Sequence, residues 1–136
     1  MDLDALRSFF HEVAADVSDG DGGWQFEIDN VRLACLADLR FDRMRLIAPV
    51  LETDVLTDEQ RDSCLEANFH TALDARYATS DGILYAAFIH PLQSLTQGDL
   101  RNAMDQVVSL VQTFGSTYSS GALVFGVPPS GGDAPN

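Results

Sequence analysis

The side chains of this 136-residue chain that could do chemistry are mainly three histidines, two cysteines and a group of serines. His11, His70 and His90 stand apart in the sequence, and no HExxH, HxH or Cys/His cluster accompanies them. Cys35 and Cys64 lack CxxC or metal-like spacing, so we expect two buried, reduced thiols. These patterns predict no metal site and no cofactor.

Motifs for nucleophilic catalysis and for nucleotide binding are also missing from the sequence. The serines between Gly115 and Gly121 do not form a GxSxG motif, and no strand-turn-helix pattern surrounds them. Two glycine-rich stretches occur, but neither opens a helix after a parallel strand, and the chain has no lysine to complete a P-loop. We therefore predict that the chain is not an enzyme.

The charge of the chain narrows the choice of partners. Eight basic residues, all arginine, stand against 21 acidic ones and give a net charge of −13. A field of this sign repels phosphate backbones and anionic lipid, so we expect neither nucleic acid nor a membrane as a partner. The acidic N-terminus does not resemble a secretory signal, and no apolar run is long enough to cross a bilayer. We expect a cytoplasmic protein.

The first half of the chain predicts one helix followed by three strands. Apolar residues at a spacing of three or four, from Leu3 to Val17, indicate an amphipathic helix over about residues 2–17, ended by the loop Ser18 to Gly23. Alternating apolar residues then indicate two strands joined by a tight Asp29-Asn30 turn, and a third over residues 43–50. We expect an antiparallel meander.

The second half predicts a helix, a hairpin and a last helix. Thr57 and Gln60 have capping-box spacing, and the helix that they begin carries more apolar residues than one narrow stripe holds. Asp81-Gly82 indicates a type I′ hairpin, whose second strand, ILYAAFIH, is apolar on both faces and should be central or covered on both sides. Thr96 caps the last helix, which Gly115 ends.

Length and composition predict a single domain with a tail. Residues 1–115 form one α+β domain, in the order α-β-β-β-α-β-β-α, with a mainly antiparallel sheet covered by helices. The Ser-, Gly- and Pro-rich residues 116–136 form a C-terminal tail, of which we expect at least 128–136 to be disordered. The apolar stretch Ala122 to Val127 could dock on the body as an extended segment.

This order of elements, in an acidic chain of this size, resembles that of the CesT-like type III secretion chaperones and of the related YbjN-like proteins. The likeness spans about Leu3 to Phe114. It is most recognisable in the helix segment CLEANF, Cys64 to Phe69, and in the hairpin around Ser80-Asp81-Gly82 that leads into ILYAAFI.

The resemblance implies a homodimer built around the second helix and the two strands that follow it. Leu65, Phe69 and Tyr77 would then supply the dimer contact, which would explain the broad apolar surface of that helix. The alternative is that the apolar residues of the helix pack in the core of the monomer.

The resemblance also implies an ATP-independent chaperone that holds an extended segment of a client protein, possible clients including a secreted effector. Phe9, at the margin of the first helix's apolar stripe, is the first candidate for client contact, followed by Trp24, Phe26 and Leu33. The alternative, which we favour for the three strand residues, is core packing. Two other functions stay open: a YbjN-like regulatory or scaffolding protein, and a small-ligand carrier or enzyme with a cleft near a histidine.

Overall fold

A computed structural model describes residues 1–121 of the chain. The elements follow the order α1 (Leu3–Val13), β1 (Ala15–Gly20), β2 (Gly23–Ile28), β3 (Val31–Asp38), β4 (Arg43–Glu52), the short 3-10 helix η1 (Thr53–Val55), α2 (Asp58–His70), β5 (Arg76–Ser80), β6 (Ile83–Pro91) and α3 (Gln97–Thr113). The expected α+β class with an antiparallel sheet is confirmed. The apolar stretch 122–127 and the expected disorder of 128–136 lie outside the described residues.

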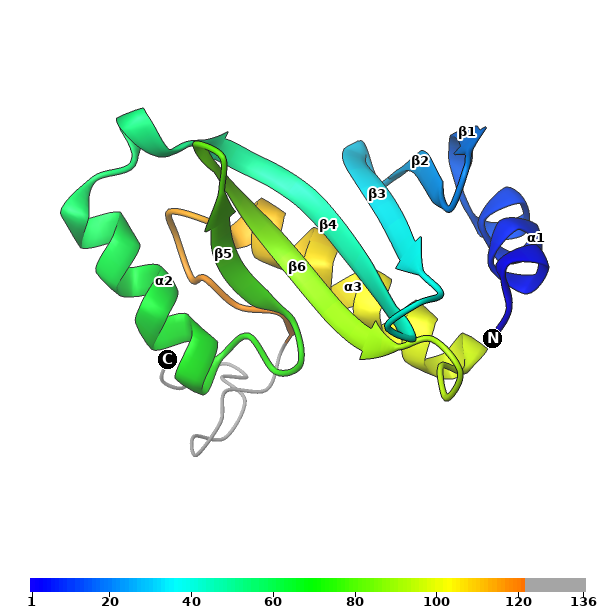
Figure 1. Cartoon of the computed structure of the whole chain (residues 1–136). Helices are drawn as coiled ribbons and strands as arrows, with labels where there is room; N and C mark the ends of the chain where they lie inside the picture. Colours follow the sequence, from blue (N-terminus) through cyan, green and yellow to red (C-terminus); the bar gives the residue numbers. More distant parts are fainter. Residues whose placement is uncertain (122–136) are drawn as a thin grey trace.

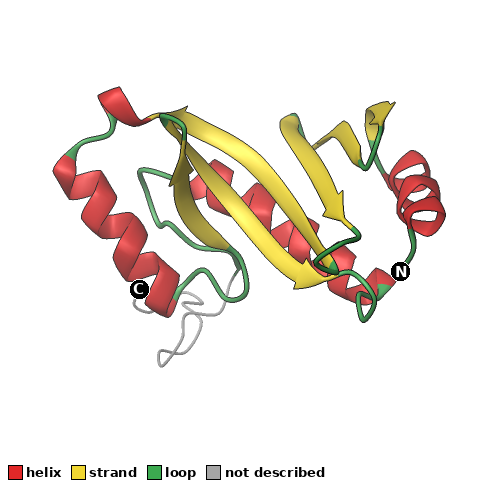
Figure 2. Cartoon of the chain, viewed as in Figure 1, coloured by secondary structure: helices red, strands yellow, loops and turns green. Residues whose placement is uncertain are grey.

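The six strands form one antiparallel sheet in the order β1-β2-β3-β4-β6-β5. The long helix α3 lies across one face of the sheet behind β4 and β6, while α1 lies beside β1 at one end and α2 beside β5 at the other (Figure 1). The face of β3, β4 and β6 that is turned toward the viewer carries no helix from residues 1–121 (Figure 2). Within this range, helices therefore cover only one face of the sheet.

Local sequence signals set most of the element boundaries. The predicted capping box of Thr57 and Gln60 opens α2, and Thr96 with Asp99 forms a second capping box at the start of α3. Asp81 and Gly82 both have positive φ, at 49° and 81°, as a type I′ turn between β5 and β6 requires. Gly115, with φ at 86°, follows α3 in the left-handed conformation expected of a helix-ending glycine.

The predicted first helix is too long. It ends at Val13, and residues 15–20 form β1, which pairs with β2 through a bulge between Ala15 and Ser18. Most of β1 is exposed, so its side chains show no apolar alternation, and only its backbone pairing with β2 defines it as a strand. The order within the described residues is therefore α-β-β-β-β-α-β-β-α.

The core lies between the covered face of the sheet and the helices. Phe10 of α1 stacks on Phe26 of β2 with ring centroids 4.3 Å apart and contacts Trp24 at 5.9 Å. Met44 and Leu46 of β4 are fully buried where α3 crosses the sheet. One continuous apolar core thus joins α1 to the rest of the domain.

The start of the tail is held against the body. The backbone N–H and the hydroxyl of Ser120 both donate to the carbonyl of Thr71, at 2.9 and 3.0 Å. The Ser109 hydroxyl donates to the carbonyl of Ser119 at 2.7 Å. Residues 116–121 therefore join the ends of α2 and α3 rather than leaving the domain at Gly115.

Asn68 of α2 closes the outer edge of β5. Its amide nitrogen donates to the carbonyl of Tyr77 at 3.0 Å, and its amide oxygen accepts from the N–H of Tyr77 at 2.8 Å. The side chain thus replaces a neighbouring strand at this point, and it protects an edge that would otherwise be open to pairing with another chain.

We expect Asn68→Ala to lower the free energy of unfolding by about 1–3 kcal/mol, because it leaves both backbone groups of Tyr77 without their partners. Chemical denaturation followed by circular dichroism measures this change. Gln112→Ala, an exposed amide on α3, is the matched control and should change stability by less than about 0.5 kcal/mol. Equal effects of the two substitutions would contradict the role of Asn68.

Candidate protein-binding surfaces

The four residues expected to contact a client are in the core. The exposed fraction is 1% for Phe9 and below 5% for Trp24, Phe26 and Leu33. Phe9 packs edge to face against Phe10, and the Arg101 guanidinium lies over its ring at 5.1 Å. All four side chains therefore pack in the core of the monomer, as we favoured for the three strand residues, and the candidate client contact at Phe9 is not exposed.

The helix α2 presents an apolar stripe to the solvent. Leu65 and Phe69 are 63% and 74% exposed, and Leu73, in the connection that follows α2, is also exposed. Their spacing of four residues places Leu65 and Phe69 on one side of the helix, whereas Cys64 and Ala67 face the core. We call Leu65, Phe69 and Leu73 the α2 stripe.

Tyr77, the third residue expected in a dimer contact, is buried instead. Its hydroxyl donates to the carbonyl of Leu110 at 2.6 Å, and its ring lies edge to face against Phe114 and Tyr118. Burial raises the pKa of this phenol above its ordinary value. Tyr77 therefore joins β5 to α3 inside the monomer.

The uncovered face of the sheet is a second apolar surface. Pairing in register places Leu36, Arg45 and Ile89 in one row across β3, β4 and β6, and Ala34, Ile47 and Ala87 in the next. Leu36 and Ile89 are 46% and 56% exposed, and the other apolar members are half-buried. We call these six residues the outer face. It contains one charged residue, Arg45, and the exposed Arg43 and Arg76 border it on the same side of the sheet.

The outer face bears on one expectation about β6. The sequence predicted a strand that is central or covered on both sides, and β6 is central, because it lies between β4 and β5. Its residues Leu84, Ala86 and Phe88 are buried on the α3 side. The opposite side, however, has no helix within residues 1–121. The signal for this surface was already present in the apolar residues that alternate with the core positions of β3 and β6.

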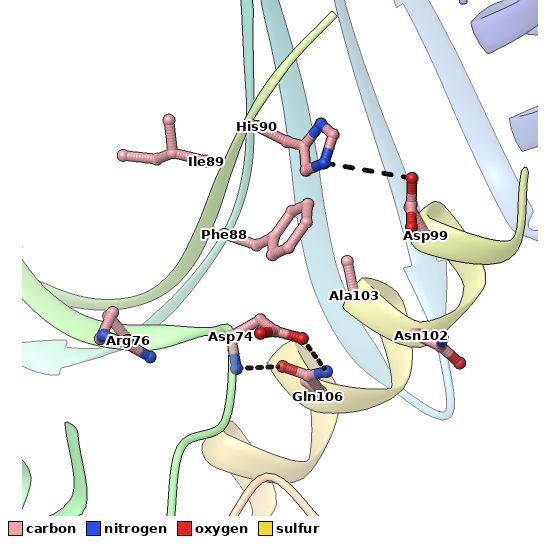
Figure 3. Close-up of a pocket in the computed structure, with 9 residues that line it drawn as sticks. All are labelled: Asp74, Arg76, Phe88, Ile89, His90, Asp99, Asn102, Ala103 and Gln106. Carbon is pink, nitrogen blue, oxygen red and sulfur yellow. Dashed lines mark hydrogen bonds and ion pairs between the residues drawn. The ribbon is translucent and has the colours of Figure 1, made fainter. Parts of the chain in front are cut away.

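A groove lies between the end of β6 and α3. It encloses about 400 Å³ and is lined by Asp74, Arg76, Phe88, Ile89, His90, Asp99, Asn102, Ala103 and Gln106. Phe88 and His90 point from β6 toward α3, whereas Ile89 points to the opposite side of the strand (Figure 3). We call this the β6 groove; no sequence motif indicated it, because it forms where β5 stops short of the end of β6.

Two polar residues of the β6 groove, Asp74 and Gln106, hydrogen-bond to each other. The Gln106 amide oxygen accepts from the N–H of Asp74 at 2.9 Å, and its nitrogen donates to the Asp74 carboxylate at 3.2 Å. His90 Nε2 lies 4.0 Å from the Asp99 carboxylate. Hydrogen bonds from Thr96 lower the pKa of Asp99, so that carboxyl is ionised at neutral pH. The lining has no serine, threonine, cysteine or lysine that could act as a nucleophile.

The other histidines and the acidic residues form no metal site in the described part of the chain. His11 pairs with Asp19 at 2.8 Å and links α1 to β1 on the surface. No group of three His, Cys, Asp or Glu side chains is placed to hold a metal ion among residues 1–121. No helix within that range is long and apolar enough to span a bilayer.

Both cysteines are buried, as expected, and neither forms a disulfide. Burial raises the pKa of the Cys35 thiol to about 12 and that of Cys64 to about 11. Because the thiolate is the reactive form, we expect neither cysteine to react with a disulfide reagent such as DTNB in the native protein at mildly alkaline pH. Both should react once the chain is unfolded. Absorbance of the released thiolate measures this, and one fast native thiol would contradict it.

Comparison with solved structures identifies the architecture. A chain of the HopA1-SchA chaperone-effector complex matches with a TM-score of 0.58 and 16% identity, over 83% of this chain and 98% of the other. A chain of the ExsC-ExsE complex matches with a TM-score of 0.62 and 17% identity, over 84% and 97%. The complex of the Yersinia pestis type III secretion chaperone SycH with a fragment of YscM2 contains a third, with a TM-score of 0.60 and 13% identity, over 82% and 98%.

The chain has the fold of the type III secretion chaperones. At these identities the likeness concerns the fold alone, and it agrees with the resemblance inferred from the order of elements. No model of a known protein family and no curated protein matches the sequence. The secretion-chaperone fold therefore rests on geometry rather than on shared sequence.

Proposed function

We propose that this protein is a homodimeric, ATP-independent binding protein that holds an extended segment of a client protein. The observation that carries the proposal is the presence of two separate apolar surfaces, the α2 stripe and the outer face, on one domain with a net charge of −13. Solvent-exposed apolar surface of this kind usually marks an interaction site. The three matched structures, each a complex of two proteins by its name, support the same kind of role.

The two surfaces are assigned to different partners. The α2 stripe is short and lies at one end of the domain, and its two most exposed members, Leu65 and Phe69, belong to a regular helix. This suits a self-complementary contact between two copies of the chain. The outer face spans three strands, β3, β4 and β6. It suits a client segment, whose apolar side chains would lie along the rows of Leu36, Ile47 and Ile89.

The client assignment is tested by affinity capture from the native cell with the wild-type chain and with Leu36→Asp. Leu36 is exposed, so the aspartate need not disturb the core, but it places a charge in the proposed contact. We expect the variant to lose the client by at least about tenfold. Leu39→Asp is the matched control, because Leu39 is exposed in the β3-β4 turn and outside the outer face. Equal capture by wild type and Leu36→Asp would remove the outer face from the proposal.

A further inference from the structure

The edge of the sheet is broken beside the β6 groove. β5 pairs with β6 only as far as Arg76 opposite Ala87, whereas β6 continues to Pro91. On its other side β6 stays paired with β4 up to Arg43 opposite Pro91. Among the described residues 1–121, residues 88–91 of β6 therefore pair with a strand on one side only. Their other edge presents backbone groups without a strand partner in that range, although Pro91 has no N–H and its carbonyl lies 2.7 Å from Nδ1 of His90.

The chain before β5 is held away from this open edge. The backbone N–H groups of Asp74 and Ala75 both donate to the Gln106 amide oxygen, at 2.9 and 3.0 Å. Gln106 is itself buried on α3, so the α2-β5 connection is fixed to the helix rather than to β6. The groove is the space left between this connection, α3 and the end of β6. The outer edge of β5, by contrast, is closed by the side chain of Asn68.

The charges around the groove favour a cation. Asp74, in the α2-β5 connection, and Asp99, in the first turn of α3, contribute two carboxylates to the lining. Arg76 contributes one guanidinium, but it donates to the carbonyls of Leu73 and Ala75 at 2.5 and 2.7 Å. His90 lies at the Asp99 end of the groove and is the remaining titratable group. With a neutral His90 the lining is net negative, within a strongly acidic protein.

We propose that the β6 groove binds an extended peptide segment that adds as a strand to residues 88–91 of β6 and directs basic side chains toward Asp74 and Asp99. Alternate side chains of the added strand would lie beside Phe88 and His90, above the small Ala103 of α3. The others would lie beside the exposed Ile89 and so continue the outer face. The inference rests on the proposed function, since it gives one stretch of the bound client its chemistry.

The test uses two synthetic capped peptides, one alternating valine with lysine and one alternating valine with glutamate. Isothermal titration measures affinity, and amide hydrogen exchange of the full chain reports on the β6 edge. We expect the lysine peptide to bind at least tenfold more tightly than the glutamate peptide and to slow exchange within residues 88–91. No binding of the lysine peptide, or binding without slower exchange there, would overturn the inference.

Variants separate the groove from the rest of the surface. Asn102→Trp, at an exposed lining position on α3, fills the groove and should weaken lysine-peptide binding at least tenfold. Gln112→Trp, further along α3 and outside the lining, should not. Asp74→Asn should weaken binding about threefold, as expected for a partly exposed ion pair, while Asp105→Asn should leave it unchanged. Equal affinities within either pair would contradict the assignment.

The failure of this inference can be told from failure of the proposed function. Leu36→Asp tests client capture at the outer face, and Leu36 lies outside the groove lining, whereas the lysine peptide is tested on the wild-type chain. Loss of client capture by Leu36→Asp together with no peptide binding would leave the proposed function supported and this inference overturned.

Discussion

Phe10→Ala is expected to lower the free energy of unfolding by about 3–5 kcal/mol, the range for removing a fully buried phenylalanine. Phe10 is 0% exposed and stacks on Phe26 at 4.3 Å, with Phe9 and Trp24 both at 5.9 Å. The rings of Phe10, Phe26 and Trp24 join α1 to β2. The backbone of α1 lies close to β1, the edge strand of the sheet. The cavity left by alanine should therefore loosen the whole N-terminal helix.

Urea denaturation of Phe10→Ala measures this loss, and Phe41→Ala provides the matched control. Phe41 is exposed in the β3-β4 turn, so its removal should change stability by less than about 0.5 kcal/mol. A loss of under 1 kcal/mol for Phe10→Ala, comparable with the control, would show that α1 does not depend on this aromatic cluster.

The double variant Leu65→Asp, Phe69→Asp is expected to raise the dimer dissociation constant by at least about 100-fold. Both positions are exposed in the monomer, so the change should not disturb its core. In the proposed dimer, two carboxylates from each copy would be buried against apolar surface without partners, which costs several kcal/mol. Sedimentation equilibrium measures the constant directly.

Val55→Asp is the control for the dimer prediction. Val55 lies in η1, is also well exposed and is not part of the α2 stripe. The wild-type chain and Val55→Asp should both sediment as dimers, and the double variant as a monomer with an unchanged circular dichroism spectrum. A wild-type chain that is monomeric at high micromolar concentration would refute the dimer.

The features that could be predicted from the sequence are those that a few neighbouring residues determine. The capping box at Thr57 and the Asp81-Gly82 turn each satisfy backbone groups within four residues, so the local sequence alone predicts both. The order of elements followed from these signals together with apolar periodicity. That order was enough to identify the fold.

The features that could not be predicted depend on contacts distant in sequence. β1 is defined by its pairing with β2, and its exposed side chains carry no periodic signal. Phe9 was expected at the margin of the apolar stripe, but Arg101 of α3 covers its ring. Tyr77 was expected at a dimer contact, but its hydroxyl donates a hydrogen bond to the carbonyl of Leu110 in α3. Both side chains are therefore buried by contacts with α3, which lies more than thirty residues further along the chain.

The candidate surfaces also divide into one that neighbouring residues indicate and two that depend on contacts distant in sequence. Leu65 and Phe69 could be named from the sequence because α2 has more apolar positions than its core contact uses. The outer face and the β6 groove could not, because they depend on which sheet face α3 covers and on β5 ending opposite Ala87. The alternative of a YbjN-like regulatory or scaffolding protein stays a prediction, separable by the identity of the captured partner.

Hydroxyl-radical footprinting of the apolar side chains tests the central claim most directly, since it measures exposure at each position with and without the captured client. We predict that Leu65 and Phe69 are protected in the protein alone, within the dimer, and that Leu36 and Ile89 become protected only when the client is bound. If Leu65 and Phe69 react in the protein alone as freely as fully exposed side chains, and Leu36 and Ile89 react as freely with the client as without it, neither apolar surface is a binding surface, and the proposed function is wrong.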